Sequence, residues 1–389
     1  MSFDFITNRV FDDRFSAFMP QAPEQITPGM FDAVRIKTGA QVLPSGDVEF
    51  SLRAPEAQSV AVRFAASGKT VTLEKGEYGI WKGTLPYDPA FIGPKALDFV
   101  VDGAVVTSPY CPAYFSHDRL INYVDIPDPG ATFCLMRDVP HGSVCTEFYW
   151  SRAFEDWQRC LVYLPADYFS TDKAYPVLYL QHGAGENETS WIYCGRTAHI
   201  MDNLIADGKA RPFIIVMNNG MVRGKRDDNW MGFQGFEDTL IEDCIPFIEK
   251  KFRVLPGKEN RAMAGLSMGS MQTSIIGLKH PELFSCLGLF SGFITTPRFD
   301  SGRSVQDYRP AHLNMLRDRE TFLREYKLYY RGIGTADIHY KAFLDDDKFL
   351  EEAGCADYPN ICRRVFEGFP HEWSVWRYML WEFAQAIFR

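Results

Sequence analysis

The pentapeptide Gly265-Leu-Ser-Met-Gly269 constrains the fold of this chain more than any other part of its sequence. Residues 262–264 before it are typical of a buried strand, whereas residues 270–279 after it carry apolar side chains at helical spacing. Glycines flanking a serine between a strand and a helix indicate a sharp turn that leaves no room for a Cβ. Such a turn exposes the serine hydroxyl and directs backbone N–H groups at a bound carbonyl. Ser267 is therefore predicted to be a nucleophile, with the Met268 N–H as an oxyanion donor.

A second glycine-rich turn, His182-Gly-Ala-Gly185, follows the apolar run 177–180 and lies 85 residues before the serine (267 − 182). Folds that carry a nucleophilic serine on a strand-to-helix turn take their second oxyanion N–H from a loop placed here. We assign that N–H to Ala184, and we expect His182 and Gly183 to lie beside the substrate.

The remaining partners of such a serine follow it in the order carboxylate, then histidine. Residues 326–330 are predicted to form a strand that leads to Asp337, and residues 364–370 lead to His371. At the carboxyl ends of adjacent strands, both side chains can reach Ser267. His371 would take the serine proton, while Asp337 would fix the tautomer of the imidazole and stabilise its charge.

His371 is chosen from eight histidines, because the other seven are placed less well. His339 follows Asp337 by two residues, which is too close for a partner. The others precede the sheet, belong to the glycine-rich turn, or lie on predicted helices or in a polar insertion: His117, His141, His182, His199, His280 and His312. Four acids remain alternatives to Asp337, although a run of acids is usually a solvated face: Asp345, Asp346, Asp347 and Asp357.

Patterns along the chain divide it into four parts. Residues 1–30 are predicted to be an irregular arm with three prolines, and residues 31–125 a β-sandwich of short alternating strands, with Asp102-Gly103 as a hairpin turn. Residues 126–138 are predicted to be a linker rich in proline. Residues 139–389 alternate strands with helices, which predicts an α/β domain whose mostly parallel sheet is covered by helices on both faces.

Two helices of this α/β domain are predicted in detail. Residues 198–206 and 236–252 are expected to be helical, and the second segment carries an apolar stripe. Pro246 lies within it and should kink the helix, because proline removes a backbone donor and its ring clashes with the preceding turn.

Composition excludes several classes of function. The net charge of −9 argues against a nucleic-acid partner, and no run of 18 apolar residues is present to span a membrane. Nine scattered cysteines without a CxxC pair, and a start that lacks the signal-peptide pattern, predict a reduced, cytoplasmic protein. Neither HExxH nor a phosphate-binding glycine loop occurs, so no metal or cofactor is expected. Whether the chain forms a homo-oligomer is left open.

Taken together, the motifs resemble the esterase D-type family of α/β-hydrolases, which includes the feruloyl esterases and acetylxylan esterases of carbohydrate esterase family one. The resemblance covers about residues 139–389. It rests on five segments: 179–191, 201–205, 264–269, 334–337 and 371–376. Carried over by position, the family's triad falls on Ser267, Asp337 and His371. The family's HGGG-like loop is HGAG here, so the Ala184 amide stands where glycine is usual, and its HDW motif appears as His-Glu-Trp.

The resemblance implies a serine carboxylic ester hydrolase that acts through an acyl-enzyme on an ester of a small molecule or an oligosaccharide. It favours a feruloyl esterase that releases hydroxycinnamates from plant cell-wall oligosaccharides. Acetylxylan esterase and siderophore esterase are alternatives within the hydrolases, and an acyltransferase is an alternative of another class. A binding protein with an inactive site is disfavoured by the complete set of three catalytic residues.

Aromatic residues are candidates for the walls of a pocket, with packing as the alternative. Two inserts, 221–235 and 294–317, are expected over the carboxyl edge of the sheet, and four tryptophans could line an aromatic acyl or sugar pocket: Trp191, Trp230, Trp373 and Trp376. The N-terminal module resembles the immunoglobulin-like sandwich found ahead of such esterases. Its Tyr78, Trp81 and Tyr110 could form a stacking platform for sugars or belong to the core.

Overall fold

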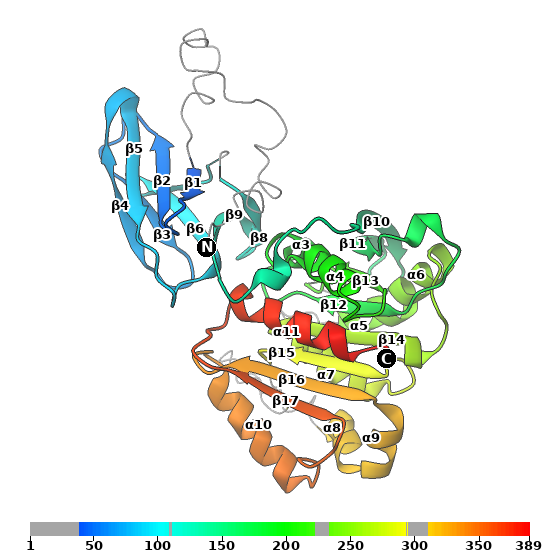
Figure 1. The fold of residues 1–389 in the computed structure, drawn as a ribbon. Helices are drawn as coiled ribbons and strands as arrows, with labels where there is room; N and C mark the ends of the chain where they lie inside the picture. Colours follow the sequence, from blue (N-terminus) through cyan, green and yellow to red (C-terminus); the bar gives the residue numbers. More distant parts are fainter. Residues whose placement is uncertain (1–38, 109–110, 222–232, 293, 295–309) are drawn as a thin grey trace. The chain divides into compact units, whose positions relative to one another are not determined.

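The computed structural model describes residues 39–108, 111–221, 233–292, 294 and 310–389. The chain splits into two compact units, Met1–Met136 and Arg137–Arg389, coloured blue to cyan and green to red in Figure 1. The division falls within the predicted linker, and the predicted arm 1–30 lies outside the described residues. No helix in the described part is both long enough and apolar enough to cross a membrane.

The first unit is built from antiparallel strands. One strand, β4, joins its two halves. Residues 70–73 of β4 pair with β3, whereas Glu74 and Lys75 pair with β5. The order is β1-β2-β5-β4-β3-β6-β9-β8, with β7 paired to β6. The strands are β1 (Gly39–Val42), β2 (Val48–Arg53), β3 (Val60–Phe64), β4 (Thr70–Lys75), β5 (Ile80–Leu85), β6 (Gly93–Val101), β7 (Ala104–Val106), β8 (Ala113–Ser116) and β9 (Arg119–Ile126).

The two halves of this unit fold over a shared core. Phe50 on β2 meets Phe64 on β3 edge to face, with ring centroids 6.0 Å apart, although two other strands separate β2 from β3 in the sheet order. A contact across that separation requires the sheet to fold back on itself, as in a β-sandwich. The predicted hairpin is present between β6 and β7, where Asp102 and Gly103 both have positive φ.

The predicted stacking platform is not supported by its one described ring. Trp81 is buried in the core of the first unit, and its Nε1–H donates to the Ala54 carbonyl oxygen at 2.8 Å. Tyr110 and the side chain of Tyr78 lie outside the described residues.

The second unit contains an eight-stranded sheet in the order β10-β11-β13-β12-β14-β15-β16-β17. The sheet is mixed, whereas the sequence predicted a mostly parallel one: the pairings from β13 to β17 are parallel, but β11 is antiparallel to both β10 and β13. A short connection, 152–155, joins β10 to β11 and forces them antiparallel. The strands are β10 (Ser143–Ser151), β11 (Asp156–Leu164), β12 (Val177–Gln181), β13 (Ile214–Asn218), β14 (Arg261–Leu266), β15 (Cys286–Phe290), β16 (Leu328–Gly334) and β17 (Ile361–Phe366).

Helices cover both faces of this sheet (Figure 1). On β15, Leu287 and Leu289 enter the main hydrophobic core with α7, α8 and α9, whereas Phe290 packs against Phe383 of α11. Helix α4 packs on α11 on that second face. The helices are α3 (Ser190–Tyr193), α4 (Thr197–Ala206), α5 (Phe233–Asp238), α6 (Ile245–Lys251), α7 (Met268–Lys279), α8 (Pro310–Arg317), α9 (Arg319–Glu325), α10 (Tyr340–Glu352) and α11 (Trp373–Ala386).

The predicted helix 236–252 is interrupted rather than simply kinked. Helix α5 passes into a π-helical segment, Thr239–Cys244, and Pro246 lies in the first turn of α6. Proline is tolerated there because the first turn of a helix has no intrahelical acceptor for its missing N–H. The wider π-helical segment lets the chain reach Pro246 without the clash that a continuous α-helix would produce.

A buried ion pair holds α10 against β16, the strand that leads to Asp337. The Arg331 side chain is 2% exposed, donates to Asp347 Oδ1 at 2.9 Å, and lies 3.6 Å from Asp346 Oδ2. Its guanidinium also lies 4.3 Å from the centre of the Phe343 ring. Because Asp346 is fully buried, it depends on this cation to offset the loss of water.

Arg331→Met should lower the free energy of unfolding of the second unit by about 3–5 kcal/mol, because it leaves the buried Asp346 carboxylate without its neighbouring cation. Urea unfolding followed by tryptophan fluorescence measures this change. Arg363→Met is the matched control, since Arg363 binds the same Asp347 but is 42% exposed, and should cost less than about 1 kcal/mol. Equal losses in the two variants would contradict this account of α10.

Candidate active site

Ser267 occupies a strained turn between β14 and α7. Its φ is 51° and its ψ −116°, a conformation that side chains rarely adopt. A Cβ at Gly265 would lie 2.5 Å from the Gly269 carbonyl group, and one at Gly269 would lie 2.6 Å from the His182 carbonyl oxygen. Both glycines of the pentapeptide are thus required by close backbone contact, which is the reason that the sequence suggested.

The predicted oxyanion loop lies against this turn. A Cβ at Gly183 would lie 2.7 Å from Leu266 Cδ1 and 3.5 Å from Ser267 Cβ. Glu186 N–H donates to the Gly183 carbonyl oxygen at 3.3 Å, and this bond closes a turn with Ala184, which is exposed, and Gly185, whose φ is +74°, at its centre. Met268 is the first residue of α7, and the first four N–H groups of a helix have no intrahelical acceptor.

The His182 ring holds the backbone of this loop. It is 1% exposed, its Nε2 accepts from Gly220 N–H at 2.8 Å, and its Nδ1 lies 2.7 Å from the Gly183 carbonyl oxygen. Because Nε2 accepts, the proton must be on Nδ1, which donates to Gly183. Burial lowers the pKa of His182 to about 4, so the ring is neutral at pH 7. In this position His182 shapes the loop backbone and does not offer its ring to solvent.

Asp337 and His371 form a close pair at the same edge of the sheet. The His371 Nδ1 lies 2.8 Å from Asp337 Oδ2 and 3.0 Å from Oδ1, and the Asp337 side chain is fully buried. His339 N–H also donates to Asp337 Oδ1 at 2.8 Å. Burial would raise the pKa of Asp337, but the hydrogen bond and charge of His371, together with the hydrogen bond from the His339 N–H, outweigh burial, and the net pKa lies below its ordinary value. Asp337 is therefore ionised and orients the imidazole.

The four alternative acids are engaged elsewhere. Asp346 and Asp347 face Arg331, as described above. Asp345 pairs with Lys341 on the exposed side of α10, and Asp357 pairs with Arg319. In the described part of the chain, the contact with His371 is made by Asp337.

His339 lies closer to the site than the sequence suggested. It was set aside because it follows Asp337 by two residues, yet its ring meets the His371 ring edge to face with centroids 4.9 Å apart. Burial, and then the charge that His371 can carry, lower the pKa of His339. Because His339 is so near to Asp337 in the sequence, it could be expected to lie at the site, although no sequence pattern indicates its contact with His371.

Three of the four predicted pocket tryptophans are buried, and their rings form a row of contacts that ends at the His371 ring. The rings of Trp191 and Trp373 lie 5.0 Å apart, those of Trp373 and Trp376 5.2 Å, and those of Trp376 and His371 5.1 Å, all edge to face. The Trp191 Nε1–H donates to the Gln181 carbonyl oxygen at 2.8 Å. These rings fix the start of α11 behind the histidine, and Trp230 lies outside the described residues.

Glu186 is a residue of the candidate site to which sequence reasoning assigns no role. The side chain is buried, its Oε2 accepts from Gly183 N–H at 3.2 Å, and its Oε1 accepts from Trp373 Nε1–H at 3.0 Å. Burial raises the pKa of Glu186 to about 7, although both hydrogen bonds act in the opposite direction. The signal in the sequence was a glutamate three residues after Gly183, in a turn preceding a buried tryptophan.

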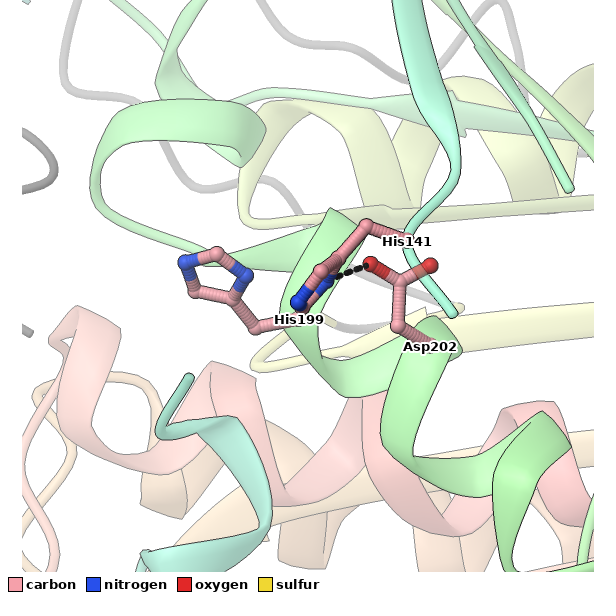
Figure 2. Close-up of side chains that lie close together, drawn as sticks. All are labelled: His141, His199 and Asp202. Atoms are coloured by element: carbon pink, nitrogen blue, oxygen red, sulfur yellow. Dashed lines mark hydrogen bonds and ion pairs between the residues drawn. The ribbon is translucent and has the colours of Figure 1, made fainter. Parts of the chain in front are cut away.

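One group in the described residues has the composition of a metal site: His141, His199 and Asp202 (Figure 2). Figure 2 shows the His141 ring bonded to the Asp202 carboxylate, with Nδ1 2.9 Å from Oδ2, and the His199 ring beside it. The other carboxylate oxygen, Oδ1, accepts from Gly142 N–H and from the Tyr163 hydroxyl. The candidate ligand atoms lie within 4.8 Å of one another.

Two members of this group, His141 and Asp202, are already joined by a hydrogen bond. A tetrahedral zinc ion would place its ligand atoms about 3.3 Å apart, from bond lengths of about 2.0–2.1 Å. The rings would have to move inward, and a cation between His141 and Asp202 would replace their hydrogen bond. As it stands, Asp202 ties α4 to residues 141–142 and to β11.

Comparison with known proteins identifies relatives that are themselves longer. The chain is 36% identical over 354 residues to an endo-1,4-beta-xylanase/feruloyl esterase of Xylanibacter ruminicola, a match that covers 88% of this chain and 45% of the relative. It is 23% identical to endo-1,4-beta-xylanase Y of Acetivibrio thermocellus over 70% of this chain and 25% of that protein. The chain thus spans less than half the length of these curated relatives.

Solved structures share the fold. A ferulic acid esterase superposes with a TM-score of 0.54 and 25% identity over 63% of this chain and 97% of that one. The enterobactin esterase of Shigella flexneri superposes with a TM-score of 0.60 and 13% identity, over 87% of this chain and 92% of that one.

The model of the Esterase family matches residues 151–358, just over half of the 389-residue chain. This segment contains the turn at Ser267, the oxyanion loop and Asp337. The chain belongs to the Esterase family.

Proposed function

We propose that this protein is a feruloyl esterase, a serine carboxylic ester hydrolase that releases hydroxycinnamates from plant cell-wall oligosaccharides. The observation that carries the proposal is the Asp337–His371 pair, which lies at the same sheet edge as the strained turn of Ser267. The name of the relative from Xylanibacter ruminicola supports the choice of acyl group.

In the first half of the reaction, the Ser267 Oγ attacks the ester carbonyl carbon, and His371 Nε2 takes the hydroxyl proton. The carbonyl oxygen becomes an oxyanion, which accepts hydrogen bonds from the Met268 and Ala184 N–H groups. Each such donor contributes about 3–4 kcal/mol to the stability of a transition state. Asp337 holds the Nδ1–H of His371 and stabilises the imidazolium that forms.

In the second half, the bond between the carbonyl carbon and the sugar oxygen breaks, and His371 gives its proton to the departing alcohol. Water then attacks the acyl-enzyme as His371 accepts one of its protons. The second tetrahedral intermediate collapses, the proton returns to Ser267 Oγ, and the carboxylic acid is released. The net reaction consumes one water molecule for each ester bond.

Hydrolysis of a siderophore ester is the second candidate. The likeness to the enterobactin esterase covers 87% of this chain, whereas the likeness to the ferulic acid esterase covers 63%. At 13% identity this likeness concerns the fold alone, so it does not favour one substrate over another.

We also propose that the protein works in a reducing compartment such as the cytoplasm. All nine cysteines lie in the described residues, all are thiols rather than disulfides, and seven of them are buried. Buried thiols are usual for proteins of the cytosol, whereas secreted proteins more often form disulfides.

Ser267→Ala should lower kcat on methyl ferulate by about 10⁴-fold or more, because it removes the atom that forms the acyl-enzyme. Chromatography of the released ferulate measures this fall in kcat. Ser274→Ala is the matched control. Ser274 is a buried serine of α7, the helix that follows Ser267, and its hydroxyl contacts the Tyr329 hydroxyl. The control should retain turnover within about twofold, and activity of Ser267→Ala within about tenfold of wild type would overturn the assignment of the nucleophile.

The acyl preference is tested by comparing kcat/KM for four esters: methyl ferulate, 4-nitrophenyl acetate, acetylated xylo-oligosaccharide and a 2,3-dihydroxybenzoyl-serine ester. We expect methyl ferulate to exceed the two acetyl esters by about tenfold or more, since filling an aromatic pocket contributes about 1–3 kcal/mol. Turnover of acetyl esters without ferulate would assign an acetylxylan esterase. Preference for the dihydroxybenzoyl ester would assign a siderophore esterase, and transfer of ferulate to added alcohol in place of water would assign an acyltransferase.

A further inference from the structure

Glu186 is a buried carboxylate that takes no part in the chemical steps above. It is 7% exposed, and both of its oxygens accept hydrogen bonds from N–H groups. A carboxylate taken out of water is costly unless such bonds replace its hydration. Its position therefore needs an explanation in the geometry of the site.

The two donors come from the two segments that must be aligned for catalysis. Gly183 precedes Ala184 in the oxyanion loop, and its backbone lies against Ser267. Trp373 is the first residue of α11 and follows His371 by two residues. Glu186 thus joins two segments that are 190 residues apart in the chain (373 − 183), through Gly183 on one side and Trp373 on the other.

The geometry of the carboxylate suits this task better than a neutral side chain would. When the carboxylate is ionised, both of its oxygens are acceptors only, and each faces one N–H group. An amide of the same shape has one oxygen and one NH₂ group, so one of the two donors would face another donor. If that donor is the Gly183 N–H, Gly183 loses its anchor and shifts. The Ala184 N–H lies in the next peptide, whose carbonyl oxygen stays bonded to His182 and to the Glu186 N–H, so it would be displaced together with Gly183 rather than released.

We propose that Glu186 is a positioning residue, whose carboxylate ties the Gly183 peptide to the Trp373 indole and so aligns the oxyanion loop with Ser267 and His371. This inference rests on the proposed ester hydrolysis at Ser267. Glu186 acts through the backbone of the loop, and the substrate need not touch it.

Glu186→Gln tests the proposal in the full-length protein at pH 8, where the wild-type carboxylate is ionised. We expect kcat on methyl ferulate to fall about ten- to a hundredfold, because a misdirected oxyanion donor weakens the transition state. KM should stay within about twofold, because the oxyanion donors act mainly in the transition state. A merely structural role would lower the melting temperature and leave kcat of the folded fraction unchanged.

Glu188→Gln is the matched control. Glu188 is a second buried glutamate of the same loop, but it pairs with Arg159 on β11 and not with Gly183. The same loss of charge two residues away should leave kcat within about twofold. A fall in kcat equal to that of Glu186→Gln would overturn the proposal, because it would assign the effect to loop charge rather than to the bridge.

Trp373→Phe provides a second route to the bridge, and it decides the question if Glu186→Gln does not fold. It removes one donor and keeps the bond from Gly183, so kcat should fall less than in Glu186→Gln. The double variant should be no slower than Glu186→Gln alone, since both changes break one bridge. Independent, multiplicative losses, or an unchanged kcat in both single variants, would overturn the inference.

The activity of the wild-type enzyme distinguishes a failure of the inference about Glu186 from a failure of the proposed function. If wild type hydrolyses none of the four esters in a manner dependent on Ser267, the proposed function is wrong and the bridge has no reaction to serve. If wild type is active and Glu186→Gln is equally active, the esterase stands and only the role of Glu186 is overturned.

Discussion

Close backbone contact around Ser267 is the constraint on which the rest of the active site depends. The strained φ of Ser267 costs about 1–3 kcal/mol and persists only where its surroundings fix it. Here Ser267 N–H donates to the Phe290 carbonyl oxygen of β15 at 2.9 Å, and Ser270 donates to the Ser267 carbonyl oxygen through both its N–H and its hydroxyl. Gly269 meanwhile touches the backbone of His182, at the end of β12. The strained turn is thus held by the two strands that flank β14.

The sheet order then brings the other two candidate catalytic residues to the same edge. Ser267, Asp337 and His371 are 70 and 34 residues apart in the chain (337 − 267 and 371 − 337). They lie at one edge because β14, β15, β16 and β17 are successive parallel neighbours whose carboxyl ends share it. The buried Arg331 holds β16 from the side opposite α11, so that Asp337 enters the site from a strand packed on both faces.

Much of this could be predicted from the sequence, because the signals are local. The strand-to-helix turn at Ser267 and the hairpin at Asp102-Gly103 each follow from backbone rules within a few residues, and the chain order of serine, acid and histidine follows from the fold that such a turn indicates. The mixed sheet could not, since the pairing of β11 depends on a partner about 55 residues away. The π-helical segment before Pro246 is likewise one of several ways to accommodate a proline, and packing selects among them.

Tryptophan illustrates the same limit within the site. From the sequence, Trp191, Trp373 and Trp376 are candidates for a pocket wall, with packing as the alternative. The structure buries all three, whereas Trp150 and Trp157 on the β10–β11 hairpin are about half exposed or more. Nothing in the residue type distinguishes the two groups, because exposure follows from which face of which element is covered.

The burial of these rings distinguishes the residues that align the site from those that could select the acyl group. Trp191 is bonded to the end of β12, Trp373 to Glu186, and Arg377 of α11 to the Cys194 carbonyl oxygen. These contacts join the Gly183 side of the candidate site to the His371 side through a layer of buried side chains. The proposed acyl transfer needs such a rigid layer, because its groups must hold their positions within about 0.5 Å. Choice of the acyl group must therefore rest on residues outside this layer, which can vary without disturbing the alignment of Ser267 and His371.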